Sequence, residues 1–184
     1  MDTLEFLRAI LPEEGVYYAA IFKPGFHAPA HKAFHSIEDL AKAIVKMDAG
    51  DWTVYHACGS YKADFVEVEV SGETKKKYRI EQNWDRAKAF WADLDCGQDK
   101  AEEGKGYLTK KDAAIAMKTF CETTGFPKPF YVDSGNGLHA YWPLTKAIPA
   151  DTWVKMATLL KAIFAHHEVL ADASCTSDFS RILR

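Results

Sequence analysis

The sequence is poor in cysteine, in long apolar runs and in basic charge, and each shortage excludes a class of protein. Its four cysteines are scattered, and no two of them form a CxxC pair. A disulfide framework is therefore not expected, and a reducing cytoplasm is the expected compartment. No apolar run approaches the length that crosses a bilayer, and the N-terminus lacks the order of a signal peptide, so we expect no membrane attachment. The net charge is −3, so any phosphate-binding surface must be local.

The histidines do not predict a zinc site. His27, His31 and His35 have the spacing of one helical face, but Pro24 and Pro29 oppose a helix there. No cysteine or acidic residue lies between these histidines. We therefore predict no zinc.

The composition that remains is that of a folded globule. Apolar residues make up 48% and aromatic residues 13% of the 184 residues, which is enough for one domain or two small ones. In the first part, apolar periodicity and a capping-box pattern at 36–39 predict a strand, a helix, a strand and a hairpin. Their ranges are 15–22, 37–50, 52–61 and 65–77. The lysines at 75–77 guard an edge strand or, alternatively, contact a nucleic-acid backbone.

The second part has a more regular order. Strands are predicted at 89–95, 129–134, 138–144 and from 169 on, and helices after Thr109 and after Pro149. This is the β-α-β-β-α-β order of ferredoxin-like and RRM-like folds, in which both helices cover one face of an antiparallel sheet. We predict the α+β class, with an N-terminal α/β module at 1–84 and an RRM-like core at 85–184.

Two aspartates end the strand FWADLD. Residues i and i+2 of a strand point to the same side, so Asp93 and Asp95 share a face. Two neighbouring carboxylates repel each other, and a hard divalent cation such as Mg²⁺ or Mn²⁺ would offset that cost. The alternative is an exposed strand end that caps a turn. Asp172, after the apolar run at 169–171, would supply a third carboxylate, or would cap a helix or turn.

A glycine-rich turn and two arginines complete the candidate site. Ser134, Gly135, Asn136 and Gly137 form either a plain hairpin turn or a hairpin turn that also exposes backbone amides to an anion. His139 follows, where it would donate to a phosphate. Arg181 and Arg184 would clamp a triphosphate or a template phosphate, or are surface charges.

Four segments together resemble the archaeo-eukaryotic primase superfamily, and most closely the primase–polymerase domains of phages and plasmids. They are FWADLDCG, the lysine-to-tyrosine stretch at 100–107, PFYVDSGNGLHAYWPL and ADASCTSDFSRILR. The resemblance covers about residues 84–184. Related domains usually continue past the arginines with a Pro-Gly-Thr-type segment, so the resemblance implies an excised catalytic domain of a longer protein.

The resemblance implies functional roles for the candidate residues. Asp93, Asp95 and Asp172 would hold two Mg²⁺ or Mn²⁺ ions, and Ser134, the glycines of the turn and His139 would hold the incoming nucleoside triphosphate. Such an enzyme would make or extend primers on single-stranded DNA, with a helicase domain or subunit as partner, in the cytoplasm of a bacterial or phage-infected cell.

Two other classes of function stay open. An RRM-like binder of single strands would stack bases on Tyr131, Tyr141 and Trp142. A metal-dependent nuclease or replication initiator would want a His-x-His pair, which the sequence lacks, and a helical tyrosine.

Overall fold

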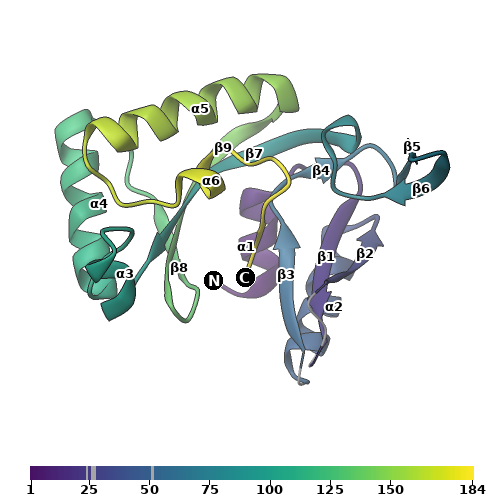
Figure 1. Ribbon diagram of the computed structural model, residues 1–184, viewed down its shortest axis with the longest axis horizontal. Coiled ribbons are helices and arrows are strands. Elements are labelled where there is room, and N and C mark those ends of the chain that lie inside the picture. The colour runs from purple at the N-terminus through teal and green to yellow at the C-terminus, as the bar shows by residue number, and fades with distance from the viewer. Residues whose placement is uncertain (24, 26–27, 51) are drawn as a thin grey trace. The chain divides into compact units, whose positions relative to one another are not determined.

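The computed structural model describes residues 1–23, 25, 28–50 and 52–184 and has a mixed α+β fold (Figure 1). By their contacts the residues group into two compact units. The first comprises Met1–Lys88, Thr145–Ala150 and Phe179–Arg184, and the second comprises Ala89–Leu144 and Asp151–Asp178. Within the described ranges, no helix is long and apolar enough to cross a membrane. His27 and Pro24, which entered the zinc argument, lie outside the described residues.

The first unit is built on a four-stranded sheet. Its elements are α1 (Thr3–Ile10), β1 (Tyr17–Phe22), β2 (Ala30–Phe34), α2 (Ile37–Asp48), β3 (Thr53–Ala57), β4 (Ser60–Tyr61), β5 (Val66–Val70), β6 (Glu73–Lys77), the 3₁₀ turn η1 (Glu81–Asn83) and β10 (Ile182–Leu183). The sheet order is β10-β3-β1-β2, and its neighbours are antiparallel. Strand β1 is buried from Tyr17 to Ile21, as its apolar run predicts. The Ser36 hydroxyl accepts from the Asp39 amide and starts α2 at the predicted place.

Three features of this unit differ from the prediction. Helix α1 and strand β2 were not predicted. The single strand predicted at 52–61 is two strands, β3 and β4, which belong to different sheets. The chain turns between them at Gly59, where a Cβ atom would lie 2.4 Å from Trp84 Nε1. This close approach of the backbone to the indole requires glycine, and it ends β3 before the chain reaches β4.

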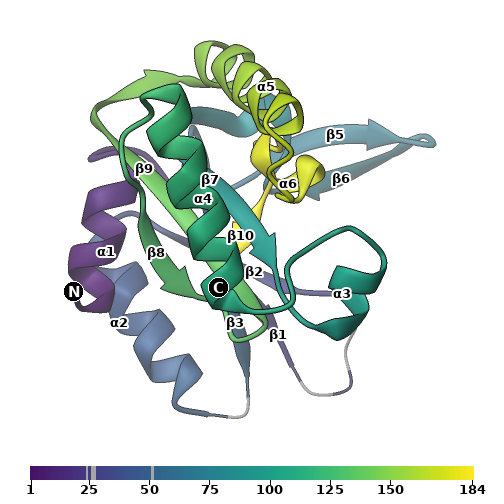
Figure 2. The same cartoon turned by 90° about the vertical axis from the view of Figure 1, so that its left-hand side faces the viewer.

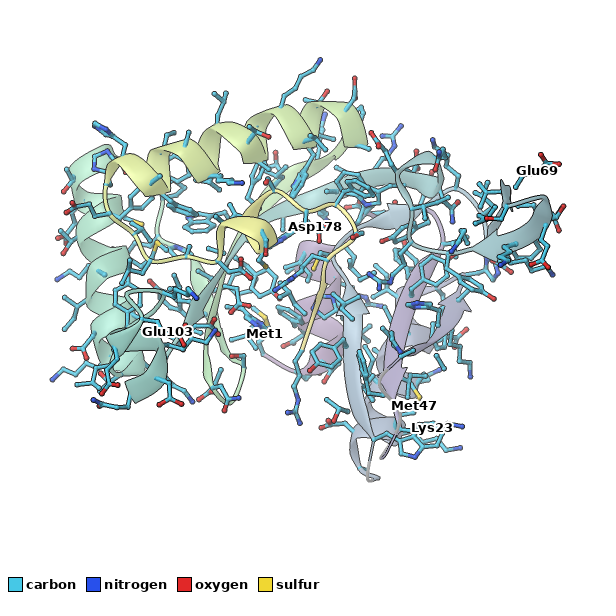
Figure 3. All side chains as sticks on the ribbon, in the orientation of Figure 1. Met1, Lys23, Met47, Glu69, Glu103 and Asp178 are labelled. Carbon is cyan, nitrogen blue, oxygen red and sulfur yellow. The ribbon has the colours of Figure 1, made fainter. Side chains whose placement is uncertain are left out.

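The predicted hairpin is confirmed. Strands β5 and β6 pair antiparallel with Val68 opposite Lys75, and they extend past β4 (Figure 1). Cross-strand pairing places the valines of β5 on one side of the hairpin and Glu67 and Glu69 on the other (Figure 3 labels Glu69). Lys75 pairs with Glu73 at 3.1 Å, and Lys76 lies over the Phe65 ring at 4.0 Å.

The second unit contains most of the region predicted to be the RRM-like core, whose residues 85–88, 145–150 and 179–184 belong to the first unit. Its elements are β7 (Trp84–Asp95), α3 (Gln98–Glu102), α4 (Lys110–Thr124), β8 (Phe130–Asp133), β9 (Gly137–Pro149), α5 (Ala150–His166) and α6 (Ala173–Thr176). The start of β7 and the end of β9 belong to the first unit. The sheet order is β4-β7-β9-β8. The order β7-β9-β8, in which the third strand in sequence lies between the first and second, is that of the split βαβ arrangement.

Both long helices pack on one face of this sheet. Phe120 of α4 contacts Phe164 of α5 at 5.0 Å between ring centroids, and Phe164 contacts Trp142 of β9 at 6.0 Å. Trp153 of α5 is fully buried and donates its indole N–H to the Ala89 carbonyl at 2.8 Å. Thr109 and Asp112 form the predicted capping box at the start of α4, and Gly125, with φ 73°, ends that helix.

The last predicted strand does not form. Residues 169–172 are irregular, and the short helix α6 follows them. The segment still lies beside β7, because the Asp172 amide donates to the Asp93 carbonyl at 2.8 Å. The Asp172 side chain caps α6, so the chain enters this helix directly after its hydrogen bond to β7.

We expect a buried histidine to make the fold sensitive to acid. His56 of β3 is 4% exposed, and burial lowers its pKa from 6.5 to about 4. Between pH 6.5 and 4 the unfolded chain therefore binds a proton that the folded chain excludes, so stability falls as the pH falls through this window. The contribution is about 3 kcal/mol over the full window.

Chemical denaturation at several pH values measures this effect. His56→Gln should flatten the dependence of the unfolding free energy on pH between 6.5 and 5. An equal slope in the native chain and in His56→Gln would contradict the assignment.

Candidate functional site

The two predicted carboxylates stand on one face at the end of β7. The burial pattern alternates there: Ala92 and Leu94 are fully buried, whereas the side chains of Asp93 and Asp95 are 16% and 33% exposed. This alternation is the period of a strand, and it places both acids on the side opposite Ala92 and Leu94.

Each carboxylate faces a nitrogen. Lys100 of α3 donates from Nζ to Asp95 Oδ2 at 2.7 Å. His139 Nε2 of β9 lies 3.6 Å from Asp93 Oδ1, which forms an ion pair when the imidazole is protonated. Lys100 lies five residues after Asp95, and nothing in the local pattern assigns it to the site.

The loop at 96–107 folds back over the end of β7 (Figure 2) and explains how Lys100 reaches Asp95. Tyr107 donates its amide to the Asp95 carbonyl at 2.9 Å and accepts at its own carbonyl from Gly97 at 2.9 Å. A Cβ atom on Gly106 would lie 2.4 Å from the Asp95 carbonyl oxygen, so this close return requires glycine.

Tyr107 also joins this loop to the Asp172 segment. Its hydroxyl accepts from the Leu170 amide at 2.9 Å, and burial raises the pKa of the phenol. The same residue therefore contacts the Asp95 backbone through its amide and the Asp172 segment through its ring. Sequence reasoning did not assign Tyr107 a role.

Asp172 lies next to Asp93 and also caps α6. Its amide donates to the Asp93 carbonyl, while its Oδ1 accepts from Ser174 N at 2.8 Å, from Ser174 Oγ at 2.6 Å and from Cys175 N at 3.3 Å. The capping alternative raised from the sequence is thus present. The same residue is held beside the Asp93 backbone.

The Ser134–Gly137 turn closes the β8–β9 hairpin. Gly135 has φ 94°, and its amide donates to Asp133 Oδ1 at 2.8 Å. The Ser134 amide donates to the Gly137 carbonyl at 3.2 Å. These two amides are therefore already engaged within the turn. Lys110 and then the Gly135 amide hold the pKa of Asp133 below its usual value.

The turn is also fixed against the end of β7. The Asn136 carbonyl accepts from the Cys96 amide at 3.0 Å. A Cβ atom on Gly137 would lie 2.3 Å from the Leu94 carbonyl oxygen. Gly137 therefore allows the turn to approach β7, and its phosphate-binding role stays a prediction.

His139 and the two arginines occupy different surroundings. His139 is buried, with its side chain 5% exposed, and lies with the aspartates in the second unit. Arg181 and Arg184 belong to the first unit. The Arg181 carbonyl accepts from the Cys58 amide at 3.4 Å, and Arg184 Nη2 lies 3.9 Å from Asp48 Oδ1. Their roles as phosphate clamps stay predictions.

The aspartates offer the ligand chemistry of a hard cation. In the described part of the chain, no three His, Cys, Asp or Glu side chains gather closely enough to hold a metal. Asp93, Asp95 and Asp172 nevertheless lie on two segments joined by a backbone hydrogen bond, and carboxylate oxygens are the ligands that Mg²⁺ and Mn²⁺ prefer. The chemistry of these oxygens suits such ions, and metal binding would require Asp95 to leave Lys100 and Asp172 to leave its cap.

Comparison with known proteins supports the fold. No family model and no curated protein matches the sequence. Among solved structures, the AEP domain of the cyanophage S-2L primase–polymerase matches with a TM-score of 0.52 and 16% sequence identity, over 98% of this chain and 76% of that chain. The chain thus has a fold like that of a primase–polymerase AEP domain.

We expect Tyr107→Phe to loosen the Asp172 segment. The change removes the acceptor of the Leu170 amide and costs about 1–3 kcal/mol. Amide hydrogen exchange should quicken at Leu170 and at Asp172. Tyr131→Phe, at an exposed tyrosine, is the control and should change neither rate. An unchanged Asp172 rate in Tyr107→Phe would show that Tyr107 does not hold this segment.

We expect Gly137→Ala to destabilise the fold. The added methyl group would meet backbone atoms of Leu94 and Asp95, which cannot rotate away as a side chain could. Such overpacking costs about 1–3 kcal/mol. Thermal unfolding measures the effect against Gly50→Ala, whose nearest atom, the Met47 carbonyl oxygen, lies at 3.4 Å. Equal melting temperatures of the two variants would exclude the close approach.

Proposed function

We propose that this chain is a DNA-templated nucleotidyltransferase, a primase–polymerase that makes or extends primers from nucleoside triphosphates on single-stranded DNA. The observation that supports it best is the placement of three aspartates. Asp93 and Asp95 share one strand face, and the Asp172 amide is bonded to the Asp93 carbonyl, on a fold like that of a primase–polymerase domain.

The three aspartates have one task in this proposal. They hold two Mg²⁺ or Mn²⁺ ions. When bound, such ions supply charge neutralisation for an attacking 3′-hydroxyl and for a leaving pyrophosphate. The strand fixes the spacing of Asp93 and Asp95, and the backbone hydrogen bond keeps Asp172 next to Asp93, so metal binding would need only the Asp95 and Asp172 side chains to exchange partners.

The hairpin turn and the basic residues orient the triphosphate. Ser134, Gly135, Asn136 and Gly137 lie at the end of β9 that adjoins the end of β7. His139 is buried beside Asp93, so it suits a contact with the part of the nucleotide that enters the site most deeply. Arg181 and Arg184 bind triphosphate or template phosphate. A helicase domain or subunit supplies the single strand, in a bacterial or phage-infected cell.

Two observations weigh against the other classes of function. Of the three aromatics that would stack bases, Tyr141 is fully buried, and Trp142 is 5% exposed and donates its N–H to the Pro127 carbonyl; Tyr131 alone is exposed. A nuclease of the initiator type needs a tyrosine on a helix. All eight tyrosines lie in the described part of the chain, on strands or in loops.

The decisive experiment tests synthesis. The purified chain is incubated with single-stranded DNA, labelled nucleoside triphosphates and Mn²⁺ or Mg²⁺. We expect labelled oligonucleotides, and we expect Asp93→Asn/Asp95→Asn to lower their yield by at least about a thousandfold, because metal stabilisation of the transferred phosphate contributes several kcal/mol. Asp99→Asn, at an acid of α3 outside the proposed set, should retain activity.

The outcomes separate the classes of function. Product from the double variant would contradict the metal site. Metal-independent binding of the single strand without any product would favour the binding module. Shortened DNA in place of extended product would favour the nuclease.

A further inference from the structure

The ammonium group of Lys100 forms an ion pair with Asp95, one of the proposed metal ligands. Its Nζ donates to Asp95 Oδ2 at 2.7 Å, and its side chain is 45% exposed. The hydrogen bond that Lys100 donates to Asp95, and then the negative charge of Asp95, raise the pKa of Lys100. Lys100 therefore neutralises one carboxylate of the proposed metal site.

The backbone at Lys100 is held by hydrogen bonds, whereas its side chain is partly exposed to solvent. The Lys100 carbonyl accepts from the Lys105 amide at 2.9 Å, and the neighbouring Ala101 amide donates to the Gly97 carbonyl at 3.0 Å. Gly106 and Tyr107 fix the same loop on the Asp95 carbonyl. Because a lysine has a flexible four-carbon stem, the ammonium can leave Asp95 while its Cα stays beside the site.

An ammonium and a divalent cation compete for the same oxygen. Mg²⁺ binds carboxylate oxygens at about 2.0–2.1 Å and demands near-octahedral geometry. A second positive charge bonded to Asp95 Oδ2 would be repelled, so a metal ion that binds at this oxygen displaces Lys100. The displaced ammonium can then form an ion pair with another anion. In a nucleotidyl transfer, the triphosphate of the incoming nucleotide supplies such an anion.

We propose that Lys100 is the resident counter-cation of Asp95, that a divalent ion displaces it, and that it then binds the phosphates of the incoming nucleotide. This inference rests on the proposed function. In this proposal Lys100 pairs first with Asp95 and then with the triphosphate. Metal binding and nucleotide binding are thereby coupled through the Lys100 side chain.

Metal binding without catalysis tests the first step. Calorimetric titration with Mn²⁺, in the absence of nucleotide and DNA, is made on the native chain, Lys100→Met and Lys105→Met. Lys105 lies in the same loop but pairs with Glu103, at 3.0 Å (Figure 3 labels Glu103). Removing the competitor should tighten Mn²⁺ binding about two- to fivefold in Lys100→Met, the range for a partly exposed ion pair. Lys105→Met should bind as the native chain does.

Nucleotide binding tests the second step. With Mn²⁺ saturating, Lys100→Met should bind a nucleoside triphosphate about tenfold more weakly, because one charge-assisted hydrogen bond is lost. Lys100→Arg keeps the positive charge and should recover most of that affinity. Weaker or unchanged Mn²⁺ binding in Lys100→Met would overturn the competition, and unchanged nucleotide affinity would overturn the transfer to phosphate.

A separate outcome marks failure of the proposed function. If Asp95→Asn binds Mn²⁺ as tightly as the native chain, Asp95 is not a metal ligand, and the premise itself is wrong. If Asp95→Asn loses Mn²⁺ binding while Lys100→Met leaves it unchanged, the metal site stands and only the role of Lys100 is excluded.

Discussion

The hydrogen bond from the Asp172 amide to the Asp93 carbonyl is the contact on which the candidate site depends. It joins two segments that are far apart in the sequence, and both contribute a carboxylate. Without it, Asp172 would be only the cap of a four-residue helix. A backbone donor suits this task, because its direction is set by the chain and not by a rotamer. Tyr107 supports the same junction, because its hydroxyl accepts from the Leu170 amide.

The long, periodic elements could be predicted from sequence. The strands around β1, β7 and β9 and the helices α2, α4 and α5 have clear apolar periods, and capping residues mark the starts of α2 and α4. Helix α1 was missed although Asp2 and Glu5 form a capping box at its start. Strand β2 has only one buried residue, Phe34, and its sequence AHKAF does not alternate between apolar and polar residues. The predicted strand at 169–172 failed because an apolar run does not reveal whether a neighbouring strand will pair with it.

The positions of the site residues could be predicted only where the two-residue alternation of a strand decides which side chains share a face. Asp93 and Asp95 had to share a face once their strand formed. The contacts of Lys100 and Tyr107 depend on how a loop returns to the strand end, and no periodicity encodes such a return. The signal that was present is Gly106, since a glycine before an aromatic residue allows close approach of two backbones. Gly137 also allows a close approach, that of the hairpin turn to β7, which no local pattern indicates.

The edge strand β10 has a consequence for the order in which the protein folds during synthesis. Its two residues, Ile182 and Leu183, pair with His56 and Ala57 of β3, which the ribosome delivers more than a hundred residues earlier. The sheet that begins to form first is thus completed last, and the intervening chain has time to form its local helices and hairpins. Until β10 arrives, one side of β3 presents an unpaired edge to the nascent chain and to its neighbours.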